Sequence, residues 1–154
     1  MDNITFNVDD SEPVEFTETV NEIIYKNQSI HKVINTIKSV VLDNSQAFKS
    51  ITTQGNITLK NNSQAFKDVY AEQGATINNS KMYATLNCSM SPFIPENSEI
   101  KEIILRSPSN NDSAPIVDLT TCTTKKVQFE DRKGQVICAK NSVQPKIYNG
   151  FIKV

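Results

Sequence analysis

The 154-residue sequence predicts a single all-β domain, a short single-stranded parallel β-helix (solenoid) with coils of about 16–18 residues. Three observations favour this fold: a hexapeptide that occurs twice, polar corners at a nearly constant spacing, and short runs in which apolar and polar residues alternate. Residues 44–49, Asn-Ser-Gln-Ala-Phe-Lys, return unchanged as residues 62–67. A unit this short cannot bury its own apolar face, whereas stacked units bury that face between them.

A polar corner that ends in serine marks the coils along the chain. Five corner serines follow one another in steps of 16, 18, 17 and 18: Ser29, Ser45, Ser63, Ser80 and Ser98. Ser142 follows the last of them after a longer step, which accommodates two enlarged coils if residues 119–121 form the corner between them. Asn and Asp tolerate a left-handed backbone at such corners, and Ser bonds to its own main chain. The spacing therefore predicts about seven coils.

Apolar residues keep a fixed position relative to each corner serine. An apolar or small residue lies two places after the serine and an aliphatic residue six places after it, as Ala47 and Ile51 do after the second corner. The same rule selects Ile100 and Ile104 after the fifth corner. Residues 55–59 alternate with the period of two that is typical of a half-buried strand. We therefore expect two or three short strands in each coil.

Two alternatives to the regular solenoid stay open at this point. A β-sandwich with polar turns roughly every 8–12 residues shares much of the pattern. Near the N-terminus, the apolar residues between positions 18 and 39 also recur at spacings of three and four, which is typical of a short helix. We favour the solenoid over the sandwich, and coils with β-branched strands over the helix.

We expect one domain with three parts. Residues 1–28 form an acidic N-terminal cap, residues 29–106 form the regular coils, and residues 107–154 form enlarged coils and a basic C-terminal cap. Residues 107–115 are polar and contain two prolines, and residues 130–135 are mostly charged. Both segments are therefore predicted to be surface excursions from a corner.

The aligned units resemble the polymer-forming bactofilins, a family of parallel β-helices with short aliphatic strands and polar corners. The resemblance runs from Leu42 to Leu86, and it is carried above all by residues 54–59 and 73–77, where a strand follows a corner glycine. It implies a bacterial structural protein that self-associates. The left-handed acyltransferase β-helices are less similar, because their strict six-residue repeat is absent from this sequence.

The sequence offers few groups for catalysis. His31 is the single histidine, and we interpret it as a surface or half-buried strand residue. A nucleophile elbow, a phosphate-binding loop and an HExxH motif are all missing from the sequence. Acidic pairs such as Asp68 with Glu72 lack aligned partners one coil away, although β-helix enzymes that act on polysaccharides use paired carboxylates. We expect no enzyme, no cofactor and no metal, and we rank a carbohydrate-active enzyme as the third choice of function.

Three aromatic residues recur at one position of neighbouring coils: Phe48, Phe66 and Tyr83. They predict a ladder on the outside of the solenoid. Such a ladder either binds a glycan or protein partner or stabilises neighbouring coils by stacking, and we favour stacking.

The formal net charge of -1 conceals an uneven distribution. Residues 1–25 carry seven acids and no base, whereas residues 124–154 carry seven bases and two acids. In a solenoid these segments lie at opposite ends, where charge either caps unpaired strand edges or joins one molecule to the next head to tail. The residues expected to make end-to-end contacts are Asp9, Asp10, Glu12, Lys140, Lys146 and Lys153.

The leading functional hypothesis is a non-catalytic structural module that self-associates. The alternative is a secreted or surface module that binds a protein or glycan partner. The near-neutral composition gives no argument for nucleic acid, and no apolar stretch is long enough for a transmembrane segment. We favour a secreted or periplasmic location, with a signal peptide removed, over the cytoplasm. We interpret the cysteines as thiols, with a bridge between the last two as the alternative: Cys88, Cys122 and Cys138.

Overall fold

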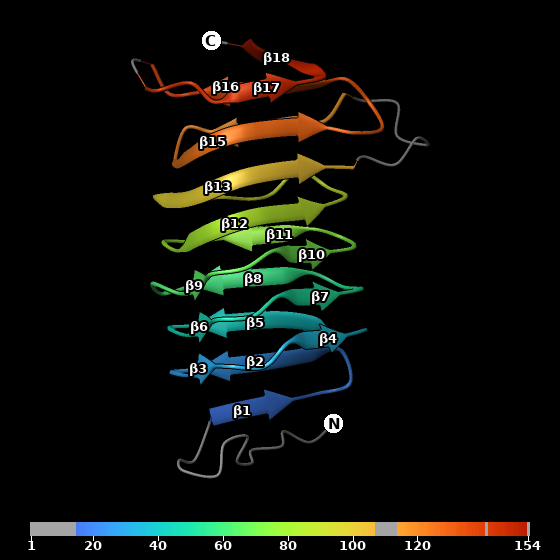
Figure 1. The fold of residues 1–154 in the computed structure, drawn as a ribbon, viewed down its shortest axis with the longest axis vertical. Coiled ribbons are helices and arrows are strands. Elements are labelled where there is room, and N and C mark those ends of the chain that lie inside the picture. Colours follow the sequence, from blue (N-terminus) through green and yellow to red (C-terminus); the bar gives the residue numbers. More distant parts are fainter. Residues whose placement is uncertain (1–14, 107–113, 141, 154) are drawn as a thin grey trace.

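The structure, a computed structural model, describes residues 15–106, 114–140 and 142–153, which form a parallel β-solenoid of about seven turns without a helix (Figure 1). Each turn is called a coil below. The strands are β1 (Glu15–Glu18), β2 (Glu22–Lys26), β3 (Ser29–Ile30), β4 (Ile34–Thr36), β5 (Ser39–Asp43), β6 (Gln46–Ala47), β7 (Ile51–Thr53), β8 (Ile57–Lys60), β9 (Gln64–Ala65), β10 (Val69–Ala71), β11 (Ala75–Ile77), β12 (Lys81–Cys88), β13 (Ser98–Leu105), β14 (Ile116–Leu119), β15 (Cys122–Phe129), β16 (Gly134–Cys138), β17 (Lys146–Tyr148) and β18 (Gly150–Lys153).

These strands confirm the all-β parallel solenoid that the sequence predicts. The helix considered between residues 18 and 39 is wrong, because this segment forms β2, β3 and β4, which belong to the first coil. Its aliphatic residues pair with those of the next coil, and this burial outweighs any local helical spacing. Parallel pairing thus begins at residue 22, within the segment assigned above to the acidic cap.

Three short strands and three turns make up each of the first three coils. In the second coil, β5, β6 and β7 are separated by a serine corner at residues 44–45 and by a bend at residues 48–50, and a glycine corner at residues 54–56 follows. In coils four to six, the strands on either side of the bend fuse into single strands of eight residues: β12, β13 and β15. The fused strands form the middle of a ten-stranded sheet that covers one side of the solenoid.

Successive coils pair in parallel and in register. Val40 of β5 lies beside Ile23 of β2 on one side and Ile57 of β8 on the other, each one coil away. In the later, enlarged coils Ser98 pairs with Cys122 and Lys126 with Lys146. Among the described strands, β1 alone is antiparallel to its partner, β2, at the N-terminal end of the solenoid (Figure 1).

The core is a column of inward aliphatic residues between the sheets. Ile51, Leu59 and Leu86 are fully buried, and the predicted aliphatic position six residues after the corner serine is buried in the second, third and fourth coils. The predicted position is wrong in the fifth coil, where Ile103 is buried and Ile104, six residues after Ser98, is only half-buried. The reason is a β-bulge between Met82 and Thr85 of β12, because β13 lacks the extra residue and each later side chain moves one position earlier.

A ladder of buried serines joins the serine corners. The backbone N–H of each corner residue donates to the serine hydroxyl one coil later, at 3.0 Å from Ser45 to Ser63, 3.2 Å from Ser63 to Ser80 and 3.1 Å from Ser80 to Ser98. These hydroxyls also contact backbone carbonyls, as that of Ser63 contacts Leu42 O at 2.9 Å. Each serine therefore replaces main-chain bonds that the turn cannot make.

The first member of this ladder is Gln28, so the predicted corner at Ser29 is displaced by one residue. Gln28 N donates to Ser45 Oγ at 3.0 Å, whereas Ser29 pairs with Gln46 and is exposed. The side-chain Nε2 of Gln28 is buried without a hydrogen-bond partner among the described residues. A glutamine lacks the short hydroxyl that occupies this position in the next four coils, and its longer side chain leaves the amide nitrogen buried without a hydrogen-bond acceptor in the described part of the chain.

The ladder ends at the predicted corner of residues 119–121. Cys122 pairs with Ser98, but Ser98 N donates to Thr121 O at 3.0 Å and not to the thiol. Ser142 is exposed, and its hydroxyl donates to Ala139 O within its own turn. Residues 130–133 form the predicted charged turn between β15 and β16, while most of the predicted loop at 107–115 lies outside the described residues.

Asparagine supplies the left-handed corners of this solenoid. Positive φ angles occur at Asn27, Asn44, Asn61, Asn62, Asn79 and Asn149 and at no described glycine. Asn tolerates this conformation because its side chain bonds locally. The four glycines serve close approaches instead, since a Cβ on Gly134 would lie 2.1 Å from the ring of Phe129. The sequence is thus rich in Asn and poor in Gly because Asn, and not Gly, occupies the left-handed corner positions.

We predict that Ser63→Ala lowers the free energy of unfolding by about 1–3 kcal/mol, because it leaves the buried N–H of Ser45 without an acceptor. Urea unfolding followed by circular dichroism measures the change.

Ser50→Ala is the matched control, since Ser50 lies in the bend of the preceding coil and is only partly buried. It is expected to change stability by less than about 0.5 kcal/mol. Equal effects of the two substitutions would contradict the serine ladder.

Candidate functional site

The bends of the first four coils carry a ladder of stacked rings. His31, Phe48, Phe66 and Tyr83 follow one another with centroid separations of 4.7, 4.9 and 5.0 Å and interplanar angles of 1°, 2° and 9°. The predicted aromatic residues are therefore neighbours in space. His31 is exposed, as expected for a surface residue, but its place in the ladder was not predicted. The signal that identifies it is its position in the repeat, one coil before Phe48.

The ring faces in this ladder are turned toward one another. Inner rings have a neighbour on both faces, so the ladder presents ring edges to solvent, and Phe48 and Phe66 are partly buried. Sugar rings and nucleobases stack on exposed aromatic faces, which this arrangement leaves only at its two ends. The geometry suits cohesion between coils, where aromatic pairs contribute about 0.5–1.5 kcal/mol each.

Polar and basic side chains flank the aromatic ladder. On one side, Gln46 Nε2 donates to Gln64 Oε1 at 2.9 Å, and Lys81 pairs with Glu99 at 3.2 Å. On the other side, the bend places an exposed lysine directly after each of the first three rings: Lys32, Lys49 and Lys67.

Two shallow grooves accompany these side chains. One, of about 480 Å³, is lined by Lys49, Lys67 and Tyr70 among others. The second, of about 200 Å³, continues the line of the ladder past Tyr83, where Lys101 and Lys125 take the positions of the rings. Basic side chains thus follow the aromatic ladder along the solenoid axis.

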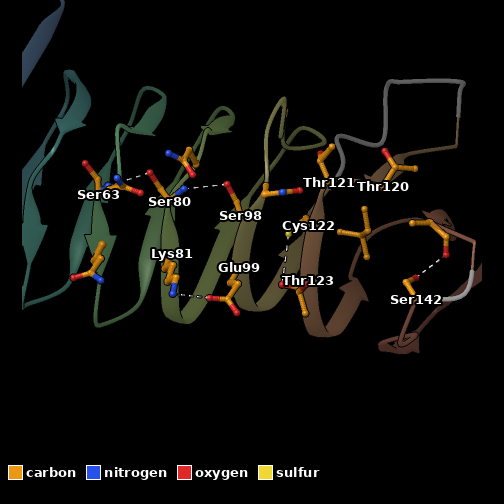
Figure 2. A pocket seen from close by; sticks show the side chains of 16 residues that line it. Ser63, Ser80, Lys81, Ser98, Glu99, Thr120, Thr121, Cys122, Thr123 and Ser142 are labelled. Carbon is orange, nitrogen blue, oxygen red and sulfur yellow. Dashed lines mark hydrogen bonds and ion pairs between the residues drawn. The ribbon is translucent and has the colours of Figure 1, made fainter.

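A larger polar groove of about 670 Å³ follows the serine corners of coils three to seven. Figure 2 shows Ser63, Ser80 and Ser98 in a row that leads toward Thr121 and Cys122. The hydroxyls of this row are engaged in the backbone bonds described above, and His31 belongs to a different corner of the coil. None of these serines therefore lies beside the single histidine of the chain.

The three cysteines are free thiols, which confirms the interpretation from the sequence. Burial raises the pKa of Cys88 from 9.0 to about 12 and that of Cys122 to about 12, and it also raises the pKa of Cys138. A raised pKa keeps a thiol protonated and weakly nucleophilic at neutral pH. These thiols pack into the solenoid as small apolar groups.

The C-terminal end of the solenoid is basic. Lys140, Lys146 and Lys153 are all exposed, and none forms an ion pair with a described acid. Lys126, one coil below Lys146, lies 5.2 Å from the ring centroid of Tyr148. Asp9, Asp10 and Glu12, the expected partners at the other end, lie outside the described residues.

Strand edges are unpaired at both ends of the described chain. β17 and β18 each have a neighbour on one side only, as do β3, β4 and β1 at the opposite end. Val33 and Ile37 at the N-terminal end are 58% and 71% exposed, and Tyr148 and Phe151 at the C-terminal end are 49% and 52% exposed. Lys38 forms an ion pair with Glu18 beside the first of these edges.

Within the described ranges, no cluster of three or more His, Cys, Asp or Glu residues is arranged to hold a metal ion. In the same ranges, no helix has the length and apolar character required to cross a membrane.

The thiols give a prediction about alkaline stability. Because the folded pKa of Cys88 and Cys122 exceeds the ordinary value of 9.0, the native state holds protons that the unfolded chain loses as the pH rises from 9 to 12. Stability is full below pH 9 and falls through this window. Cys88→Ala and Cys122→Ser are each expected to flatten the fall in urea midpoint between pH 8 and pH 11. Curves parallel to the wild type above pH 9 would contradict the raised pKa values.

Comparison with known proteins adds no family assignment. No family model, curated protein sequence or solved structure matches the chain. What the structure shows is the architecture, a parallel β-solenoid of about seven turns.

Proposed function

We propose that the chain is a non-catalytic structural module that self-associates end to end. The observation that carries this proposal is that the strand edges at opposite ends of one solenoid have no partner among the described residues and carry exposed apolar side chains. An exposed edge offers a row of backbone donors and acceptors to another chain. The two ends differ, so their contact is heterologous and propagates as an open filament or closes as a ring.

The edges are matched in length. In the ten-stranded sheet, β4 at one end and β17 at the other each contain three residues. On the other side of the solenoid, β1 and β18 each contain four. A second copy added at the C-terminal end continues the parallel stacking where β17 meets β4, whereas β18 would meet β1, which is antiparallel to the coils, in an antiparallel pair.

Charge supports the same pairing of ends. Seven acids and no base lie in residues 1–25, and the exposed Lys140, Lys146 and Lys153 lie at the C-terminal end. Opposite charges at the two ends guide association and set its polarity. The resemblance to the polymer-forming bactofilins, carried by residues 42–86, points to the same class of function.

A capping role for these charges is the competing explanation, because proteins also use charge to keep strand edges apart. The two explanations differ in the sign of the salt effect. If the ends attract one another, added salt screens the attraction and reduces association. If the charges keep capped molecules apart, added salt screens the repulsion and increases association.

We predict that wild-type protein shows a mass by light scattering that rises with protein concentration at low salt and falls as salt is added. The triple substitution of Lys140, Lys146 and Lys153 to Glu is expected to shift this rise to at least ~10-fold higher concentration, because it places acids at both ends.

The matched control replaces Lys49, Lys67 and Lys101 by Glu, which changes the net charge equally in the middle of the solenoid. Its association is expected to follow the wild type. A wild type with the mass of one chain at every salt and protein concentration, or equal effects of the two triple substitutions, would show that the ends do not drive assembly.

A further inference from the structure

One side of the solenoid is strongly basic although the whole chain is nearly neutral. The basic face is defined here as the ten-stranded sheet with its bends: residues 29–36, 46–53, 64–71, 81–88, 98–105, 122–129 and 146–148. It contains eight lysines and three acids, a formal excess of five positive charges. The lysines are Lys32, Lys49, Lys67, Lys81, Lys101, Lys125, Lys126 and Lys146, and the acids are Asp68, Glu99 and Glu102.

Most of this positive charge is not neutralised by the protein. Lys81 pairs with Glu99, but no other lysine of the basic face forms an ion pair with a described acid. Asp68 and Glu102 are already engaged, since both contact Thr85, at 3.0 and 3.3 Å. The face therefore keeps its charge available for a partner.

The lysines of the bends form a column with the period of the coils. Lys32, Lys49 and Lys67 each follow a ring of the aromatic ladder, whose members are 4.7–5.0 Å apart. Lys101 and Lys125 continue the line of the rings themselves in the next two coils. Like charges on directly opposed positions destabilise a sheet, so this column lowers the stability of the free protein.

We propose that this column binds a linear acidic polysaccharide laid along the solenoid axis. A polyuronate carries one carboxylate on each sugar ring, so its charges repeat over a length comparable with one coil. Its carboxylates would pair with Lys32, Lys49 and Lys67 and then with Lys101 and Lys125. Lys49 and Lys67 line the 480 Å³ groove, and Lys101 and Lys125 line the 200 Å³ groove.

The aromatic ladder favours an acidic polysaccharide over a single-stranded nucleic acid. Sugar rings and bases both stack on exposed ring faces, but sequence-independent nucleic-acid binding depends on this stacking, whereas a polyuronate is also held through its carboxylates and hydroxyls. Here the faces are occupied by neighbouring rings, and the edges that remain are the positive pole of the ring quadrupole. Ring edges and ammonium groups together suit anionic oxygens, and the amides of Gln46 and Gln64 beside them suit sugar hydroxyls.

The test is a binding titration with an end-labelled oligogalacturonate, followed by fluorescence anisotropy. Protein is used at concentrations at which light scattering gives the mass of one chain, so the result is independent of end-to-end association. We expect saturable binding that weakens as salt is added, and no binding of the methyl-esterified oligosaccharide, which has the same backbone without charge.

The variant Lys32→Gln/Lys49→Gln/Lys67→Gln is expected to bind at least ~10-fold more weakly while remaining folded, because relief of like-charge repulsion raises its melting temperature at low salt. The matched control is Lys26→Gln/Lys60→Gln/Lys133→Gln, which removes equal charge outside the basic face. It is expected to bind within about twofold of the wild type.

Three outcomes would overturn the proposal. The first is absence of binding to the charged oligosaccharide at low salt. The second is an equal loss of affinity in the two triple variants, which would indicate attraction to overall charge without a site. The third is binding of a single-stranded oligodeoxythymidylate of the same charge as tightly as, or more tightly than, the oligogalacturonate, which would assign the face to nucleic acid.

Discussion

The structure depends on parallel backbone pairing between one coil and the next. This pairing fixes the rise at about 4.8 Å per coil and places each side chain directly beside its counterpart one coil away. A residue type that interacts favourably with a copy of itself at this distance therefore stabilises the fold when it is repeated in successive coils. The buried aliphatic column, the serine ladder and the stacked rings all meet this condition, which is why a six-residue sequence can occur unchanged in two coils.

The same constraint is unfavourable for charged residues, because it places like charges beside one another in successive coils. Lys49 and Lys67 stand one coil apart because their neighbours Phe48 and Phe66 stack well, so stacking is gained together with repulsion. At the ends of the solenoid, the pairing groups of the last strands have no partners within the part of the chain that the structure describes. Both proposals above follow from this condition, since a polyanion would offset the repulsion along the side and a second copy would complete the pairing at the ends.

The repeat and the alternation of apolar residues were sufficient to predict the parallel solenoid, its seven coils and the alignment of Phe48 with Phe66. They were not sufficient where the coil length changes by one residue. The bulge in β12 moved the buried position from Ile104 to Ile103, and no residue type marks such a bulge in advance. Gln28 does not stand out at the first corner because it is not a serine, and His31 does not stand out in the ladder because the sequence alone indicates only a surface or half-buried strand residue. Position in the repeat, and not residue identity, is the signal for both.

The most direct test of the parallel stacking is nuclear magnetic resonance of the isotopically labelled protein, with contacts between backbone protons used to assign strand pairing. Parallel coils predict that the difference between the two residue numbers stays constant along a pair of strands, as it does from Ile23 with Val40 to Tyr25 with Leu42. The exception is the bulge of β12, where the difference changes by one residue between Met82 with Ile100 and Thr85 with Glu102. The same rule applies in the enlarged coils, from Ser98 with Cys122 to Leu105 with Phe129. Antiparallel contacts, for which the sum of the two residue numbers is constant, are expected only between β1 and β2 within the described ranges. A series of constant-sum contacts across the middle of the chain, as in a β-sandwich, would contradict the solenoid and both proposals that rest on it.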